Sequence, residues 1–196
     1  MLRGERVILR EYRRDDLPEI RKWINNEAVV RNLGFWMYPQ TVVESEEWLE
    51  RQLTHKGAPQ DIQFAIALAD DPQETYIGGI GLHGIDLRNR HAELGITIGR
   101  EDLHGQGLGT EAIQLLLEYS FAFLNLHKIN LSYFEYNDRG ARCYARCGFR
   151  EEGRIRENRY YEGRYWDVIR MGITEEEFRR ARQAAQGGSR PEQPAP

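Results

Sequence analysis

Three glycines at alternate positions form the most distinctive short pattern in the sequence. Gly105, Gly107 and Gly109 lie within the stretch HGQGLGT, and Thr110 follows the last of them. Glycine lets a backbone approach a ligand closely, and the first N–H groups of a helix lack intrahelical partners. A turn of this kind between a strand and a helix is therefore a candidate binding site for phosphate.

Three known glycine patterns compete to explain this turn. A Walker A loop requires Lys and then Ser or Thr after its last glycine, but Thr110 and Glu111 follow Gly109 here. A dinucleotide pattern is met only in its looser form, ending at Ala112, and it belongs to a first βαβ unit rather than to mid-chain. The acyl-CoA turn, [Arg/Gln]-x-x-Gly-x-[Gly/Ala], matches the segment except that His104 occupies its first position.

The residues on either side of this turn have the patterns of a strand and a helix. Leu94, Ile96 and Ile98 alternate with smaller residues, which is the period-two pattern of a half-buried strand. After the glycines, apolar side chains recur at helical spacing, which predicts an amphipathic helix. We expect its buried face to comprise Leu108, Ala112, Leu115, Leu116, Tyr119 and Phe123.

The composition of the whole chain limits the classes of protein to consider. A length of 196 residues is consistent with one domain, and a formal net charge of −4 argues against general nucleic-acid binding. No apolar run is long enough to span a membrane, and the N-terminus lacks the apolar core of a signal peptide. We therefore expect a cytoplasmic protein with no membrane or nucleic-acid partner. Residues 1–183 would form a single domain and residues 184–196, rich in Gly, Pro and Gln, a disordered tail.

The cysteines and histidines indicate neither a disulfide nor a metal site. Cys143 and Cys147 lie four residues apart in a helical pattern, where side chains point outward in parallel, so we expect two reduced thiols. The five histidines lack the spacing of metal ligands. We expect no bound metal.

The remaining periodicities predict a mixed fold. Apolar runs predict strands at residues 7–9, 64–68, 76–85, 128–136, from residue 149, and at 165–173. Capping residues and helical spacing predict helices that begin near Asp15 or Asp16, Thr41, Asn137 and Thr174. Because strands outnumber helices and their order is mixed, we expect an α/β (α+β) fold with a mostly antiparallel sheet.

Several segments together resemble the GNAT family of N-acetyltransferases, in particular the subgroup that acetylates ribosomal-protein N-terminal alanine or spermidine. They are ITIGREDLHGQGLGTEA, LNLHKINLSYFEYNDRGARCYARCGF, the opening ERVILREYRRDDL and the closing EGRYWDVIRMGI. The resemblance covers roughly residues 2–178. The chain departs from the family's pattern at His104, where Arg, Gln or Trp is commoner, and at Gly140, where Ala is commoner.

The resemblance implies a sheet of about six to seven strands flanked by helices, with a splay between its two central strands. It also implies acetyl-CoA as donor, a primary amine as acceptor (a small molecule such as a polyamine, or a protein N-terminus), and a possible homodimer. The pyrophosphate would contact N–H groups from Gln106 to Thr110, and the pantetheine would lie between residues 96–98 and residues 131–134. We expect acetyl-CoA to contact Ile96, Thr97, Ile98, His104, Gly105, Gln106, Gly107, Leu108, Gly109, Thr110, Asn137, Arg142 and Tyr144.

A carboxylate on the strand before the turn is a candidate general base. An amine with a pKa near 10.4 is neutral in only about one molecule in 2,500 at pH 7, so a carboxylate, or water held by one, must accept its proton. Glu93 lies on this strand and shares a face with Gly95 and Thr97. The alternative is a surface carboxylate or an ion pair with Arg90. A backbone N–H near Ile96 or Thr97 would stabilise negative charge on the thioester oxygen.

Tyr144 corresponds to the family's tyrosine and is our candidate to protonate the leaving thiolate. The alternative is a core aromatic residue. Asn137 lies seven residues earlier, on the same side of the predicted helix, and would either cap that helix or contact pantetheine. Arg139, Arg142 and Arg146 would either belong to a solvated face or supply one contact with the 3′-phosphate.

Two questions stay open at the level of sequence. A domain that binds acyl-CoA as a sensor without turnover would carry the same turn, so it is the alternative to an enzyme. The acceptor also remains undetermined. Aromatic residues would either line its pocket or serve as lid or dimer contacts; they are Phe35, Trp36, Tyr38, Tyr160, Tyr161 and Tyr165.

Overall fold

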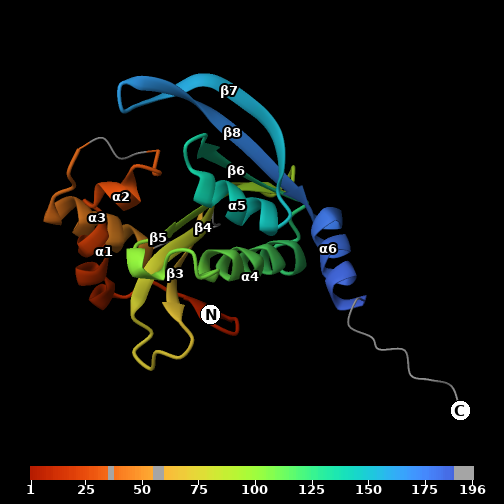
Figure 1. The fold of residues 1–196 in the computed structure, drawn as a ribbon. Coiled ribbons are helices and arrows are strands. Elements are labelled where there is room, and N and C mark those ends of the chain that lie inside the picture. Colours follow the sequence, from red (N-terminus) through yellow and green to blue (C-terminus); the bar gives the residue numbers. More distant parts are fainter. Residues whose placement is uncertain (35–37, 55–59, 188–196) are drawn as a thin grey trace, which may run out of the picture.

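A single twisted sheet organises the molecule, for which a computed structural model describes residues 1–34, 38–54 and 60–187. Eight strands lie in the order β1-β2-β3-β4-β5-β6-β8-β7 (Figure 1). They are β1 (Leu2–Arg3), β2 (Val7–Arg10), β3 (Ile62–Leu68), β4 (Tyr76–Asp86), β5 (His91–Ile98), β6 (Lys128–Phe134), β7 (Arg150–Tyr161) and β8 (Arg164–Thr174). The mixed fold is as expected. The sheet has one more strand than expected, because β1 is only two residues long and so short a segment shows no hydrophobic period.

In the described part of the chain, six α-helices and two short 3₁₀ turns connect or flank the strands. They are η1 (Arg14–Asp16), α1 (Leu17–Trp23), α2 (Glu27–Val30), α3 (Val42–Leu53), η2 (Glu101–Leu103), α4 (Leu108–Ala122), α5 (Asp138–Arg146) and α6 (Glu175–Gly187). The expected cap of α3 is confirmed, since Thr41 and Glu44 form a reciprocal capping box. Helix α6 continues past the expected boundary at residue 183, and residues 188–196 of the predicted tail lie outside the described part of the chain. None of the described helices has the length and apolar character needed to cross a membrane.

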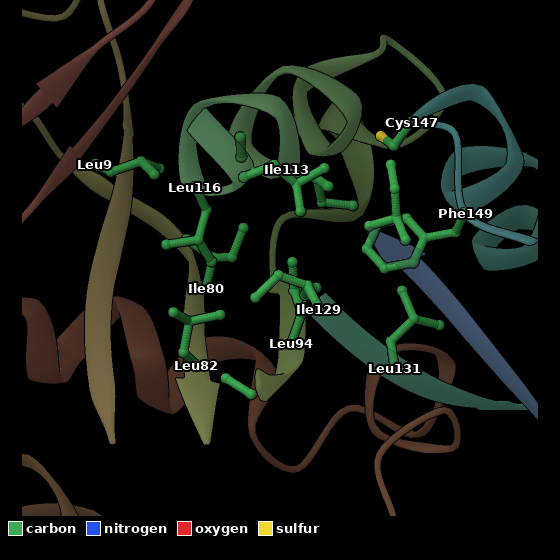
Figure 2. Close-up of a cluster of buried hydrophobic side chains, with 14 of the residues drawn as sticks. Leu9, Ile80, Leu82, Leu94, Ile113, Leu116, Ile129, Leu131, Cys147 and Phe149 are labelled. Atoms are coloured by element: carbon green, nitrogen blue, oxygen red, sulfur yellow. The ribbon is translucent and has the colours of Figure 1, made fainter. Parts of the chain in front are cut away.

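The two faces of the sheet support two separate apolar clusters. Neighbouring residues of β3 contribute to opposite clusters, because side chains alternate across a strand: Ile66 packs on the α4 side and Ala65 on the side of α1 and α3. Figure 2 shows the larger cluster, in which Ile113 and Leu116 of α4 lie over Ile80 of β4. This cluster anchors α4, and through it the glycine turn.

The buried face of α4 differs from the one expected. The buried residues are Leu108, Ala112, Ile113, Leu116, Leu117, Ser120 and Phe121. Phe123, expected to be buried, is 75% exposed and stacks on Tyr119 at 5.2 Å between ring centroids. It follows the last turn of the helix, so the ring lies beyond the part of α4 that covers the sheet.

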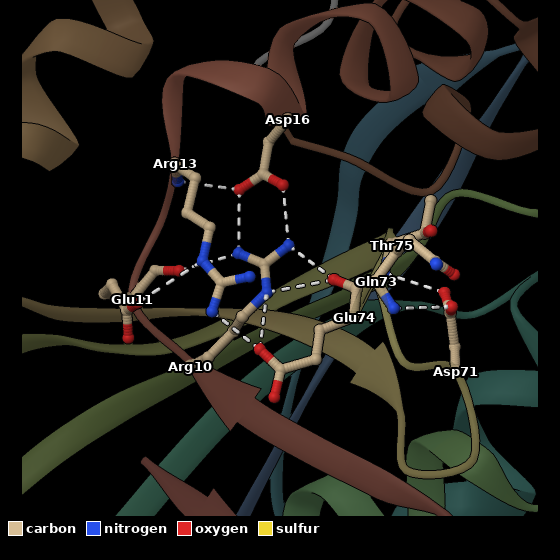
Figure 3. Close-up of polar contacts among 8 residues, drawn as sticks. All are labelled: Arg10, Glu11, Arg13, Asp16, Asp71, Gln73, Glu74 and Thr75. Carbon is tan, nitrogen blue, oxygen red and sulfur yellow. Dashed lines mark hydrogen bonds and ion pairs between the residues drawn. The ribbon is translucent and has the colours of Figure 1, made fainter.

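A buried ion pair ties β2 to the helices that follow it. Figure 3 shows Arg10 of β2 contacting both carboxylate oxygens of Asp16, at 2.9 and 2.6 Å, with both residues at most 4% exposed. The same guanidinium donates to the carbonyl of Glu74 in the β3–β4 turn. Asp16 occupies the N-cap position of α1, one of the two positions expected, but its carboxylate makes no capping bond there because Arg10 and the N–H of Arg13 hold it.

The only parallel pair among the described strands is β5 with β6, and it is short. The pairing covers Glu93 with Asn130 and two residue pairs before it, and then stops. Strand β5 continues to Ile98 while still paired with β4 on its other side. The two central strands therefore diverge after Glu93, which is the splay implied by the family resemblance.

Candidate active site

A cavity of about 360 Å³ opens where β5 ends, between the glycine turn and α5. Every expected acetyl-CoA contact except Gln106 lines it: Ile96, Thr97, Ile98, His104, Gly105, Gly107, Leu108, Gly109, Thr110, Asn137, Arg142 and Tyr144. Arg139 and Arg146, which share with Arg142 the expectation of a possible phosphate contact, line the cavity as well. Gly140 and Cys143 also line it and were not expected, although helical spacing from Tyr144 and Arg139 would have found them. Val29, Asn32 and Leu33 carry no local signal and reach the site only through the tertiary fold.

The glycine turn has the geometry of an anion cradle. Gly107 is the N-cap of α4 with φ of +83° and Gly105 has φ of +78°, a backbone region that favours glycine. A Cβ at Gly109 would lie 3.8 Å from its nearest neighbours, Cys143 Sγ and Ile96 Cδ1, so it would project into the cavity without a clash. The first turn of α4 presents N–H groups without intrahelical partners to this space. The residues present thus fit a phosphate group.

Gln106 is the one expected contact that does not line the cavity. Its side chain turns away and donates to the carbonyl of Asp102 at 2.8 Å. Its own carbonyl accepts from Arg6, and Arg6 also pairs with Glu111 of α4 at 3.0 Å. Gln106 and Arg6 therefore brace the turn from outside.

His104, the departure from the family's pattern, points into the cavity and is held at both ring nitrogens. Its Nε2 lies 2.8 Å from the carbonyl of Ile98, and its Nδ1 lies 2.6 Å from Arg139 Nη1. The ring thus connects the end of β5 to α5. Arg139 lines the same cavity.

Asn137 is the N-cap of α5, one of the two roles that the sequence left open, and it lies at the cavity. Its side-chain oxygen accepts from the N–H of Gly140 at 3.0 Å, which makes it the N-cap of α5, and the residue also lines the cavity. A Cβ at position 140 would lie 2.6 Å from Asn137 Nδ2. Glycine at this position therefore leaves room for the asparagine side chain, which gives a physical reason for the second departure from the family's pattern.

Tyr144 and Cys143 lie next to each other on the cavity side of α5. The Tyr144 ring packs against Tyr133 and Phe149, with centroids 5.8 and 6.4 Å away, and burial raises the pKa of its phenol. Cys143 Sγ lies 3.4 Å from Thr110 Oγ1. Hydrogen bonding with Cys147, and then with Thr110, lowers the pKa of the Cys143 thiol. Both cysteines are free, as expected.

Glu93 and Tyr144 are not brought into one cavity. Glu93 is exposed on the face of β5 away from α4, beside a second hollow of about 330 Å³. Other polar residues that line this hollow are His83, Asn130, Ser132, Glu152 and Arg170, and apolar residues such as Leu131 and Met171 line it as well. Glu93 is nevertheless the last β5 residue paired with β6, so it lies where the splay begins.

Of the six aromatic residues considered as acceptor contacts, the four that the structure describes do not line the cavity. Tyr160 and Tyr165 are exposed and pack on each other at the hairpin end, and Tyr38 is 63% exposed. Tyr161 instead packs on Tyr136. Phe35 and Trp36 lie outside the described residues.

Within the described ranges, no group of three or more His, Cys, Asp or Glu side chains is arranged to hold a metal ion.

Comparisons with known proteins agree with this geometry. A family model described as the acetyltransferase (GNAT) domain matches residues 6–150. A spermidine N(1)-acetyltransferase of Vibrio cholerae is 33% identical over 176 residues, which cover 89% of this chain and 96% of that protein. The ribosomal protein uS5 alanine N-acetyltransferase of Escherichia coli K12 is 28% identical over 116 residues, 59% of each chain. A crystal structure of the Vibrio cholerae spermidine N-acetyltransferase with CoA and spermine has a TM-score of 0.77 and 31% identity, and the match covers 89% of this chain and 99% of that one.

Proposed function

The chain belongs to the acetyltransferase (GNAT) family, and we propose that it transfers the acetyl group of acetyl-CoA directly to a primary amine. One arrangement carries the proposal: the glycine turn, the open edge of β5 and the Tyr144 phenol meet at a single cavity. The turn can bind a pyrophosphate, the strand edge can pair with the amides of a pantetheine arm, and the phenol can donate a proton to a leaving thiolate. These three groups follow one another along the acetyl-CoA molecule.

The turn and the helices beside it would hold the phosphates. Gly107 and Gly109 allow close approach, and the N-terminus of α4 carries partial positive charge. Arg142 and Arg146 of α5 add full positive charges on the cavity wall. We assign them to the phosphates because an arginine fork matches phosphate oxygens.

The edge of β5 beyond Glu93 would hold the pantetheine. Its ladder with β6 has ended, so backbone groups from Leu94 to Ile98 face the splay without a strand partner on that side. The pantetheine amides pair with such groups as an added strand would. One N–H of this edge would also stabilise negative charge on the thioester oxygen.

Tyr144 would protonate the departing sulfur. Because burial raises the pKa of this phenol, it keeps its proton across the neutral range and has one to donate. The ring is held by Tyr133 and Phe149, so the hydroxyl is positioned before the substrate binds.

Glu93 would accept the proton of the amine, directly or through water. Its carboxylate lies at the origin of the splay, on the opposite face of the sheet from α4. An amine that approaches the thioester from this face would pass it. Polyamines are the first acceptors to test, because the spermidine acetyltransferase matches this chain over a far larger share than the alanine acetyltransferase does.

Thiol release from acetyl-CoA, measured over a panel of amines, tests the proposal. The panel comprises spermidine, spermine, an alanine-terminated peptide, an aminoglycoside and an amino sugar, and calorimetry measures acetyl-CoA binding separately. We expect binding and amine-dependent thiol release with at least one acceptor class. Binding without release for any amine would instead favour the non-catalytic acyl-CoA sensor.

A further inference from the structure

His104 connects three parts of the candidate site through its imidazole ring. The residue belongs to the turn that follows η2, its Nε2 contacts the carbonyl at the end of β5, and its Nδ1 contacts Arg139 of α5. The two distances, 2.8 and 2.6 Å, are both within hydrogen-bond range. His104 and Arg139 also line the cavity itself.

The contact with Arg139 determines the form of the ring. A guanidinium has donors and no acceptor, so Nδ1 must accept and therefore carries no proton. The carbonyl of Ile98 can only accept, so Nε2 must carry the proton and donate it. Both contacts are therefore satisfied by the imidazole tautomer that carries its proton at Nε2.

The imidazole leaves the charge of Arg139 uncancelled. No ion pair joins Arg139 to a carboxylate within the residues that the structure describes, although Glu101 lies near enough to act on it electrostatically. Some other arginines of this chain are held by carboxylates, as Arg10 is by Asp16 and Arg6 by Glu111. Those partners neutralise the guanidinium, whereas an imidazole orients it and keeps its full charge for an anion.

We propose that His104 is a positioning residue that holds Arg139 in place to bind a phosphate of acetyl-CoA. The inference rests on the proposed use of this cavity for acetyl-CoA. It gives the unusual residue of the turn a role that depends on its side chain, in addition to the backbone cradle. Without the ring, the flexible Arg139 side chain would have to be ordered at the expense of binding free energy.

A double-mutant cycle on acetyl-CoA affinity tests this coupling. Arg139→Met removes the charge and keeps the length, and we expect the dissociation constant to rise roughly tenfold, the effect of one charged hydrogen bond. His104→Leu should raise it several-fold. The double variant should bind about as weakly as Arg139→Met alone, because the ring acts through the arginine. Effects that multiply in the double variant would overturn the inference.

A conservative variant separates positioning from general packing. In His104→Gln, the amide oxygen can accept from Arg139 while the amide nitrogen donates to Ile98, so affinity should stay near that of the wild type. If His104→Gln binds as weakly as His104→Leu, the two hydrogen bonds are not what matters and the inference fails. Arg88→Met, a change at an exposed arginine outside the cavity, is the control, and thermal unfolding checks that each variant is folded.

Binding measured with acetyl-CoA and with 3′-dephospho-acetyl-CoA shows which phosphate Arg139 contacts. The same measurements distinguish a failure of this inference from a failure of the proposed function. With 3′-dephospho-acetyl-CoA, loss of the Arg139→Met effect assigns Arg139 to the 3′-phosphate, and persistence assigns it to the pyrophosphate; either result supports the inference. A wild-type protein that does not bind acetyl-CoA overturns the proposed function and this inference together. Multiplying effects in a wild type that does bind overturn this inference alone.

Discussion

At the scale of single residues, the chemistry of the site depends on which form each titratable group takes. Burial keeps the phenol of Tyr144 protonated, and the contacts with Arg139 and Ile98 favour the tautomer of His104 that carries its proton at Nε2. Cys143 is the opposite case, since its neighbours favour the thiolate. Each of these states follows from neighbours in the fold rather than from residue type.

Tyr144→Phe should lower kcat by about 10²-fold, the low end of acid–base contributions, with little change in acetyl-CoA affinity. Because the pKa of Tyr144 is raised, its proton is lost only above the ordinary tyrosine range near 10, and wild-type kcat should not fall between about pH 8 and pH 10. Steady-state kinetics over this range checks both points. Tyr133→Phe is the matched control, since that ring packs on Tyr144 but does not line the cavity. An unchanged kcat in Tyr144→Phe would mean that this residue only packs.

Glu93→Gln should lower kcat/KM by about 10²–10⁴-fold at neutral pH, because the substitution keeps the shape and removes the proton acceptor. Residual activity should move to high pH, where solvent deprotonates the amine. Glu152→Gln makes the same change in the same hollow, where Glu152 pairs with Lys128 at 2.7 Å, and should leave the rate near that of the wild type. A Glu93→Gln enzyme with the wild-type rate and pH profile would return Glu93 to the alternative of a surface carboxylate.

One of the two thiols should react much faster with iodoacetamide at pH 7. Cys143 lines the cavity and has a lowered pKa, so its thiolate forms at a lower pH than that of an ordinary thiol. The hydrogen bond with Cys143, and then burial, raise the pKa of the Cys147 thiol. Cys143→Ser should abolish the fast phase, and bound CoA should protect it. Mass spectrometry of the labelled peptides checks the assignment, and equal labelling of the two thiols would contradict it.

At the scale of elements, two glycines of the turn before α4 have different roles: the backbone conformation requires one, and space for the ligand requires the other. The positive φ at position 107 requires glycine, so the Gly107→Val variant should be less stable by about 1–2 kcal/mol. A loss of acetyl-CoA binding in this variant would therefore not distinguish a lost contact from a disturbed fold. Gly109 lies inside the first turn of α4 with space for a Cβ. The two glycines therefore call for different experiments.

Gly109→Ala should raise the dissociation constant for acetyl-CoA roughly tenfold without loss of stability. The added methyl group makes only ordinary contacts with the protein but occupies the cavity. Alanine is also favoured over glycine in a helix by up to about 1 kcal/mol. Calorimetry and urea denaturation measure the two effects, with Gly153→Ala as a control outside the cavity. A folded Gly109→Ala that binds as the wild type does would contradict the cradle.

At the scale of the whole molecule, one buried ion pair ties the sheet to the helices that cover one of its faces. Arg10 of β2 is paired in register with Ala65 of the smaller cluster, and Asp16 leads into α1 of the same cluster. Removing one partner of a buried pair leaves an uncompensated charge. This contact therefore anchors α1 and the smaller cluster to β2.

Asp16→Ala should lower the free energy of unfolding by roughly 3–5 kcal/mol. Asp15→Ala removes the same group from the exposed neighbouring position and should change stability by no more than about 0.5 kcal/mol. Urea denaturation at pH 7 compares the two. Equal, small effects would show that Arg10 finds other partners, with the carbonyl of Glu74 the first candidate.

Much of the fold and site could be read from local sequence. The alternation of Leu94, Ile96 and Ile98 predicted β5, the Thr41 capping box predicted the start of α3, and the three glycines predicted the turn before α4. These features depend on residues within a few positions of one another. The family resemblance added the splay and the role of Tyr144, which no periodicity indicates.

Tertiary contacts decided what local patterns left open. The face of α4, the use of Asp16 by Arg10 and the approach of Val29 and Leu33 to the cavity all depend on surfaces that meet only in the fold. The partner of His104 is 35 residues away, so no local rule could have named Arg139. Sequence by itself thus determined the elements and the phosphate turn, because hydrophobic period and backbone freedom are local properties. The tertiary structure alone decided how side chains are paired and charged, because pairing requires proximity in space.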